Sequence, residues 1–480
     1  MYTAYANETD EYGLLDESQE RTSDIPLSPA MSYLLLVGWL VLCAIALGVV
    51  VFARSPVAGA IVVAIPTFVG MVIKPTFALC MLMLVLPTGA GIAWRQAFSL
   101  DRAVGLAVAL SFFLNVLLTR PGLRIRHKEL WVAAGLSVWI AVTSLLQPHL
   151  ADEVRRAFTQ FQLVLLILIV YWILETNHES AFRWALRCYV LGMVGSVIVA
   201  LRSGQAIRAV QETRDVRYAA TLGHAIDANM LSALIALAFL SAIYLLARDR
   251  SLFWRMFYVG AILFLPLMTI RTGSRGGLVA LAFTLLSPLL FVRQVLRRPA
   301  LAALLLAIVL LASLSAGLLI KEQGLAGAVA ERLTSLDHAK KALAFRMEAV
   351  RSAVHAVLAW PAGTGYISWF ERTGSPIWPH SDFFFALGVY GFPGAALFTA
   401  LVLLLLGTVR RTPLTMEKLY ARAVLTFLLV MGLNIKQVSA KYFWVFLAFV
   451  LAAERLGWGH VEPEEDGIDD TDEEAPDTGA

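Results

Sequence analysis

Residues 228–247 read ANMLSALIALAFLSAIYLLA, a stretch of twenty residues without one charged side chain. A helix rises about 1.5 Å per residue, so this stretch can cross a hydrocarbon core of about 30 Å. Similar apolar blocks recur along most of the chain. The strands of a membrane β-barrel would instead alternate over about 10 residues. The pattern predicts an all-α fold, a polytopic transmembrane helix bundle.

The composition agrees with a membrane protein. Of the 480 residues, 59% are hydrophobic and 15% are charged, and the mean hydropathy is +0.72. Soluble globular chains are about 45–50% apolar and about 25% charged. These values exclude an ordinary cytosolic enzyme, a disordered protein and a nucleic-acid-binding protein. The three cysteines, Cys43, Cys80 and Cys188, lie in apolar blocks and indicate no disulfide framework and no metal site.

The apolar blocks predict about 12–14 membrane spans. The candidates are 31–53, 57–73, 75–93, 100–118, 129–147, 158–175, 182–201, 228–247, 256–270, 277–292, 300–320, 382–407, 418–434 and 441–453. Acidic residues dominate both ends of the chain. The predicted organisation has five parts. They are a disordered acidic tail at 1–30, a transmembrane bundle at 31–320, an external helical segment at 321–381, further transmembrane helices at 382–455 and a second disordered acidic tail at 456–480.

Lysine and arginine in short loops predict the orientation. Alternate loops are basic and are placed in the cytoplasm; they contain Arg120, Arg124, Arg126, Lys128, Arg248, Arg250, Arg255, Arg293, Arg297, Arg298, Arg410, Arg411 and Lys418. Because each span carries the chain to the other side of the membrane, 202–227, 271–276 and 321–381 are then predicted to lie on the outer side. These outer segments are basic as well. Long translocated loops can ignore the positive-inside rule, but the outer arginines also suit an anionic ligand such as a phosphate.

The external segment is predicted to be helical over 324–360. Met347, Val350, Val354 and Val357 follow helical spacing and form one apolar stripe, which we expect to lie against the bundle or the membrane interface. Trp360-Pro361 should end this helix, because proline disfavours helical backbone in the residue before it.

His380 opens the first candidate site. His380-Ser381 is followed by nine residues and then by Gly391-Phe392-Pro393-Gly394. Ser381 or Asp382 could cap the next helix, and the positive end of that helix would keep a nearby imidazole neutral, as a general base requires. The alternative is an ordinary interfacial histidine. The two glycines permit a break or a close helix approach.

The second candidate site is the turn Arg271-Thr-Gly-Ser274-Arg275-Gly-Gly277. A glycine-rich turn can expose backbone N–H groups, and flanking arginines would complete an anion site. The alternative is a tight turn whose arginines reach lipid head groups. The third candidate site consists of Arg346 and Arg351 of the external segment. The alternative is that these arginines form ordinary salt bridges. Asp227 and Asn229 are a fourth, although Asp227 also suits a helix N-cap. The residue pattern predicts no metal site and no cofactor.

These pieces together resemble the O-antigen ligase and O-antigen polymerase superfamily of bacterial membrane glycosyltransferases. The resemblance rests on the turn 274–277, on the Arg-led external helix ending at Trp360-Pro361 and Gly363-Thr-Gly-Tyr366, and on His380-Ser381-x9-Gly391-x2-Gly394. Asp227-Ala-Asn229 resembles the family's Asp-Pro-Asn, with alanine in place of proline. The resemblance covers about 220–400.

The resemblance implies a metal-independent enzyme of the bacterial inner membrane with its active site on the periplasmic side. It would transfer a glycan from undecaprenyl diphosphate to a lipid A-core sugar or to a lipid-linked repeat. The catalytic residues would be His380, Arg275 and Arg346, with the arginines holding the diphosphate. His380 would contact the acceptor hydroxyl or the diphosphate, and the acceptor role is favoured because the attacking hydroxyl must lose its proton. The substrate-binding residues would be Arg271, Ser274, Arg351, Arg214, Arg217, Asp227 and Asn229.

Two questions stay open at the level of sequence. The pattern does not separate a ligase from a polysaccharide polymerase. The alternative function is a transporter or flippase of lipid-linked glycans, which would need charged or broken helices near the bilayer midplane. Few charges lie in the middle of the predicted spans, so the enzyme is favoured.

Overall fold

The computed structural model describes residues 56–88, 100–119, 127–202, 208–210, 215–217, 220–221, 224–225, 227–286 and 336–458. The predicted fold class is confirmed, because this part of the chain is an all-α polytopic helix bundle. Its candidate membrane spans, long and apolar enough to cross a bilayer, are Lys128–Leu145, Leu150–Asn177, Glu179–Arg202, Ala228–Arg248, Leu252–Arg271 and Asp382–Arg411. The predicted spans 31–53 and 300–320, the predicted tail 1–30, residues 459–480 of the second predicted tail and Cys43 lie outside the described residues, whereas residues 456–458 of that tail are helical.

The helices appear in the following order along the chain. They are α2 Pro56–Ile73, α3 Pro75–Val85, η3 Leu86–Thr88, α4 Leu100–Thr119, α5 Lys128–Leu145, α6 Leu150–Arg202, α7 Ala228–Arg248, α8 Leu252–Arg271, α9 Arg275–Leu286, α13 Leu336–Ala359, α14 Trp369–Thr373, α15 Asp382–Arg411, α16 Met416–Gly432 and α17 Lys441–Trp458. Two short antiparallel strand pairs lie between α6 and α7, namely β1 Arg208–Val210 with β2 Asp215–Arg217 and β3 Ala220–Thr221 with β4 His224–Ala225.

Helix α6 contains two of the predicted spans, 158–175 and 182–201, which match the candidate spans Leu150–Asn177 and Glu179–Arg202. The two spans follow one another in one helix of 53 residues, without the loop that the sequence suggested. The intervening stretch contains neither glycine nor proline, so nothing forces the backbone out of the helix. Its polar side chains bond to the helix itself: Thr176 Oγ1 donates to the Trp172 carbonyl at 2.8 Å and Asn177 Nδ2 to that of Ile173 at 3.0 Å.

Helix α15 breaks at Gly391, as the two-glycine pattern suggested. Gly391 has φ 72° and ψ −170°, a conformation open to glycine but not to other residues without strain. The turn after α13 satisfies the backbone groups freed by the break. Thr364 N donates to Gly388 O at 3.2 Å, and Phe392 N donates to Pro361 O at 2.9 Å.

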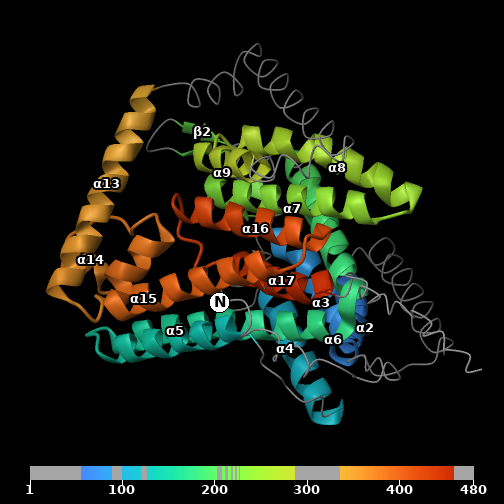
Figure 1. The fold of residues 1–480 in the computed structure, drawn as a ribbon, viewed down its shortest axis with the longest axis horizontal. Coiled ribbons are helices and arrows are strands. Elements are labelled where there is room, and N and C mark those ends of the chain that lie inside the picture. The colour runs from blue at the N-terminus through green and yellow to red at the C-terminus, as the bar shows by residue number, and fades with distance from the viewer. Residues whose placement is uncertain are drawn as a thin grey trace, which may run out of the picture.

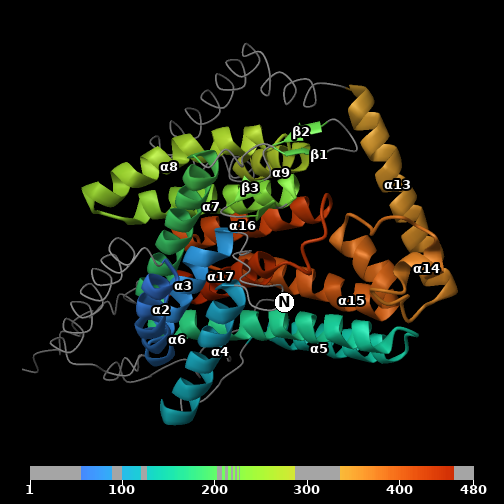
Figure 2. The same cartoon turned by 180° about the vertical axis from the view of Figure 1, so that it is seen from behind.

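Helix α13 lies across one end of the bundle, roughly perpendicular to α5, α15 and α16 (Figures 1 and 2). It ends at Ala359, directly before Trp360-Pro361, as predicted. The predicted stripe, however, is only partly buried within the bundle: Val357 is buried, and Val350 is half-buried. Met347 is 48% exposed and Val354 is 41% exposed, whereas Ala353 is fully buried.

Alanine forms the buried face of α13 because the helix approaches α15 closely. The buried alanines are Ala349, Ala353 and Ala356. A Cβ on Gly388 of α15 would stand 3.3 Å from the Cα of Ala353, so only small residues fit on both sides. The apolar spacing of Met347, Val350, Val354 and Val357 therefore identified the helix, and its buried face at Val357, but not the buried alanines.

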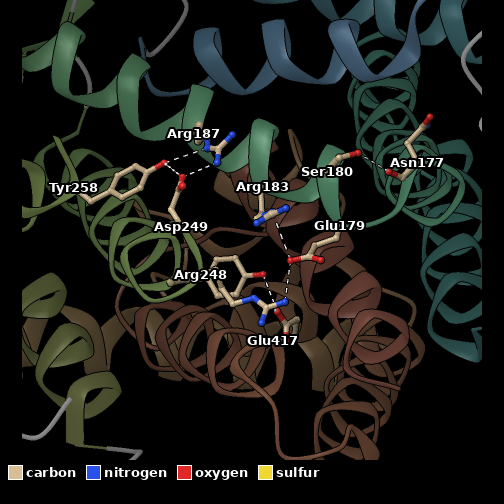
Figure 3. A network of polar contacts seen from close by, with 10 residues as sticks. Asn177, Glu179, Ser180, Arg183, Arg187, Arg248, Asp249, Tyr258 and Glu417 are labelled. Carbon is tan, nitrogen blue, oxygen red and sulfur yellow. Dashed lines mark hydrogen bonds and ion pairs between the residues drawn. The ribbon is translucent and has the colours of Figure 1, made fainter. Parts of the chain in front are cut away.

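Ion pairs hold the opposite end of the bundle together (Figure 3). Arg248, the last residue of α7, bonds Glu179 of α6 at 2.8 Å and lies 3.2 Å from Glu417 of α16. Arg187 of α6 bonds Asp249 at 2.5 Å. Glu417 is fully buried, so its charge depends on these partners.

Candidate functional site

Six chain segments meet at the end of the bundle that α13 crosses (Figure 1). They are the N-terminus of α7, the turn between α8 and α9, helix α13, the segment from α13 to α15, the start of α15, and the connection 433–440 between α16 and α17. All the predicted site residues whose side chains are described lie on these segments, and contacts between the segments define the site.

The N-terminus of α7 is joined to the α8–α9 turn. Asp227 caps α7 as predicted, its Oδ1 accepting from the backbone amides of Asn229 at 2.8 Å and Met230 at 3.2 Å. Ser274 Oγ in turn donates to Asn229 Oδ1 at 2.8 Å. Asn229 thus positions the serine that directly precedes Arg275.

Three backbone amides of the α8–α9 turn bond within the turn and are not available to an anion. Gly273 N bonds to Ile270 O at 2.9 Å, Ser274 N to Thr272 Oγ1 at 3.2 Å and Gly277 N to Ser274 Oγ at 3.1 Å. These amides are used inside the turn. The side chain of Arg275, the half-buried first residue of α9, stays a candidate for binding an anion here.

Asn434 links this turn to α13. Its Oδ1 accepts from Arg346 Nη1 at 2.8 Å. On its other side Asn434 packs against Gly276, where a Cβ would stand 2.9 Å from the asparagine Cβ. Asn434 therefore lies between Arg346 and the residue next to Arg275. The sequence analysis missed Asn434, because an asparagine in a short connection forms no pattern with residues far away in the chain.

His380 stands beside Arg346, outside the first turn of α15. The pKa of His380 lies below its usual value, first because neighbouring atoms displace water from the ring, and also because Arg346 and Lys436 are positively charged. Asp227 opposes this shift. The histidine nevertheless remains an exposed residue. A lowered pKa keeps the imidazole neutral near pH 7, the form that accepts a proton.

The predicted side-chain cap of α15 is wrong. Ser381 is the N-cap residue, but neither it nor Asp382 caps the helix through its side chain. The Asp382 carboxylate is buried and accepts instead from the backbone amides of Gln437 at 2.5 Å and Val438 at 2.8 Å. The Asp382 carboxylate therefore bonds to the connection 433–440 and not to the amides of its own helix. These bonds hold the connection close to His380.

Lys436 is a second residue that the sequence analysis missed. Its Nζ donates to the Tyr366 hydroxyl at 2.9 Å and lies 4.7, 4.2 and 4.9 Å from the ring centres of Tyr366, Trp378 and Phe385. Burial lowers the pKa of Lys436 to about 7; Arg156 adds to the shift and Asp382 opposes it. Three aromatic faces favour the charged amine. In the sequence, Lys436 is a single basic residue in the short stretch between the predicted spans 418–434 and 441–453, and this gave no reason to select it.

The segment carrying Tyr366 is held by one carboxylate. Glu153, near the start of α6, is fully buried. It accepts from the backbone amides of Tyr366, Ile367 and Ser368 at 2.9, 2.6 and 3.1 Å. A Cβ on Gly365 would come within 2.5 Å of this carboxylate, which explains the glycine. The external segment is thereby fixed to the bundle.

An apolar groove begins beside His380. A cavity of about 340 Å³ lies between α15 and α16, with Ser381 and Asp382 at one end. Its walls include Phe383, Phe398, Val402, Leu429, Leu433 and Phe443. The Oγ of Ser381 is buried and has no hydrogen-bond partner among the described residues. The groove can take a hydrocarbon chain whose polar end reaches this hydroxyl.

The remaining predicted residues lie apart from these contacts. Arg271 is the half-buried last residue of α8, and Arg351 is exposed on α13. Arg217 is the last residue of β2, and Arg214 lies outside the described residues. No group of three or more His, Cys, Asp or Glu residues in the described ranges could hold a metal ion.

Comparison with known proteins adds no family to this description. No family model matches the chain, and a search of curated proteins finds no match. The resemblance to the O-antigen ligase and polymerase superfamily therefore rests on the residues of this chain alone, and membership in that superfamily stays a prediction.

Proposed function

We propose that the protein is a membrane glycosyltransferase that moves a glycan from undecaprenyl diphosphate to a sugar hydroxyl. The observation that carries this proposal is the cluster of Arg346, His380 and Asn434 beside the Arg275 turn, at one end of a membrane bundle. The proposed location is the bacterial inner membrane, with this end facing the periplasm.

The cluster suits a diphosphate leaving group. Each guanidinium can bond two phosphate oxygens at once and stays protonated at neutral pH. As the bond between the anomeric carbon and the diphosphate oxygen breaks, its electron pair stays on the leaving diphosphate. Arg275 and Arg346 would stabilise that growing negative charge.

His380 would serve the acceptor. The acceptor oxygen forms the new bond to the anomeric carbon and loses its proton to the neutral imidazole. The lowered pKa of His380 supports this role, since the ring must be unprotonated before the reaction. The groove between α15 and α16 starts at Ser381 and would receive part of the polyprenyl chain.

The test is transfer by purified protein from a lipid-linked donor, with and without a chelator. Arg346→Ala and His380→Ala should each lose activity. Lys340→Ala and His355→Ala change exposed residues of α13 and should not. Full turnover in His380→Ala would end the catalytic assignment, and loss of wild-type activity with the chelator would exclude the metal-independent reaction.

Deletion of the gene in the source organism distinguishes a polymerase, a ligase and a transporter. Surface glycan shortened to single capped repeats would indicate a polymerase. Long chains stranded on the lipid carrier would indicate a ligase. Loss of all outer-leaflet intermediates would indicate a flippase and contradict the proposal.

A further inference from the structure

Hydrogen bonds hold the side-chain amide of Asn434 in one orientation. Its Nδ2 donates to the Val430 carbonyl at 3.2 Å, and its backbone amide donates to Met431 at 2.8 Å. The amide nitrogen therefore faces the end of α16, and the oxygen faces Arg346, 2.8 Å from Nη1. An arginine side chain with many rotamers is held in one direction by this single acceptor.

Gly276 provides the room for that arrangement. A Cβ at this position would lie 2.9 Å from both Cβ and Cγ of Asn434 and 3.1 Å from its Oδ1. The atom that would be displaced is the same oxygen that accepts from Arg346. Gly276 is buried and helical, so its need for glycine comes from this neighbour and not from the backbone conformation.

The acceptor is an amide and not a carboxylate, and this difference matters for an anion site. A carboxylate would orient the guanidinium but would also neutralise its charge. An amide oxygen orients it and leaves the full positive charge, with most of the five N–H donors free for a ligand. Burial of Arg346 lowers its pKa, yet a guanidinium stays protonated in proteins.

We propose that Asn434 is a positioning residue that aims Arg346 toward a diphosphate, and that Gly276 acts only by leaving space for it. This inference rests on the proposed function. The pair connects the two arginine-bearing elements α9 and α13 through a connection that is itself fixed by Asp382. Neither Asn434 nor Gly276 needs to touch the substrate.

The experiment measures binding of farnesyl diphosphate to purified variants, together with thermal unfolding in the same detergent. Asn434→Ala and Gly276→Ala should each weaken binding about 10- to 100-fold, the range for losing a hydrogen bond to a charged group. The double variant should be no weaker than either single one, because both remove the same contact. Gly260→Ala is the matched control, since a Cβ there meets nothing within 4 Å.

Asn434→Asp separates positioning from mere packing. Aspartate keeps an acceptor for Arg346 but cancels its charge, and it also loses the bond to the Val430 carbonyl, so binding by the folded protein should fall at least as far as in Asn434→Ala. If Asn434→Asp binds as the wild type does, or if the effects of Asn434→Ala and Gly276→Ala add, the inference is wrong. If Arg346→Ala also binds normally, the proposed diphosphate role of Arg346 has failed as well.

Discussion

The backbone amide of Gly365 donates to the carbonyl oxygen of Val389 at 3.1 Å. This bond joins two glycine-rich segments that are separate in the sequence, the turn after α13 and the break in α15. Trp139 of α5 completes the arrangement, since its indole N–H donates to the Tyr390 carbonyl at 2.7 Å. The broken turn of α15 therefore has its carbonyls satisfied by two other parts of the molecule.

Gly391→Ala should unfold this arrangement. The backbone conformation at 391 is restricted to glycine, and an added Cβ would meet Pro361 and Ala362. We expect a loss of stability of about 1–3 kcal/mol from the backbone alone, and more from the collision. Thermal unfolding in detergent measures this. Gly407→Ala, in the same helix, meets only the end of Arg411 at 3.9 Å and should leave the melting temperature unchanged.

His380→Ala should lower turnover about 10²- to 10⁴-fold, the usual contribution of a general base, and leave binding of a lipid diphosphate nearly intact. Separate measurement of the turnover number and of the donor dissociation constant checks this. A variant that lost binding and kept turnover would assign His380 to the diphosphate instead.

The pH profile should report the charges around His380. The lowered pKa means that the imidazole stays neutral to a lower pH than an ordinary histidine, so activity should fall only on acidification below about 6.5. Lys436 is protonated in that acidic range and helps to lower the pKa. Lys436→Met should therefore move the acidic limb of turnover to higher pH. An unchanged limb would show that another group controls it.

Arg275→Lys separates charge from geometry. Lysine keeps the positive charge but loses the planar fork, so it should retain partial activity, whereas Arg275→Ala should retain almost none. Loss of such a contact costs about 2–4 kcal/mol, or roughly 30- to 1000-fold in rate. Equal activity in both variants would argue against a bidentate contact. The in vitro transfer assay measures both.

Arg248→Ala tests the far end of the bundle. It would leave the buried carboxylate of Glu417 without its cation, at a cost of about 3–5 kcal/mol. The melting temperature should fall, while the folded fraction should keep its turnover, because Arg248 ends α7 and the other end of that helix, at Asp227, is the one near His380. Arg250→Ala, an exposed neighbour, should change neither quantity.

The sequence predicted features that depend on near neighbours. The helical bundle, the end of α13 at Trp360-Pro361, the Asp227 cap and the break at Gly391 all follow from local spacing or backbone chemistry. Asn434 and Lys436 could not be predicted, because their roles depend on Arg346 and Tyr366, 88 and 70 residues away. The buried alanines of α13 were missed because close packing selected alanine over the larger apolar residues.

The break at Gly391 also divides α15 into two parts, residues 382–390 and the longer stretch that follows. Residues 382–390 of α15 contact α13, α14 and the turn 361–365, and they also join the main hydrophobic core through Phe385, Val389 and Tyr390. The first turns of α15 therefore join helix α13 and the turn after it to the core of the bundle. A chimera that exchanges α13 and that turn between related chains should carry residues 382–390 and the connection 433–440 with them.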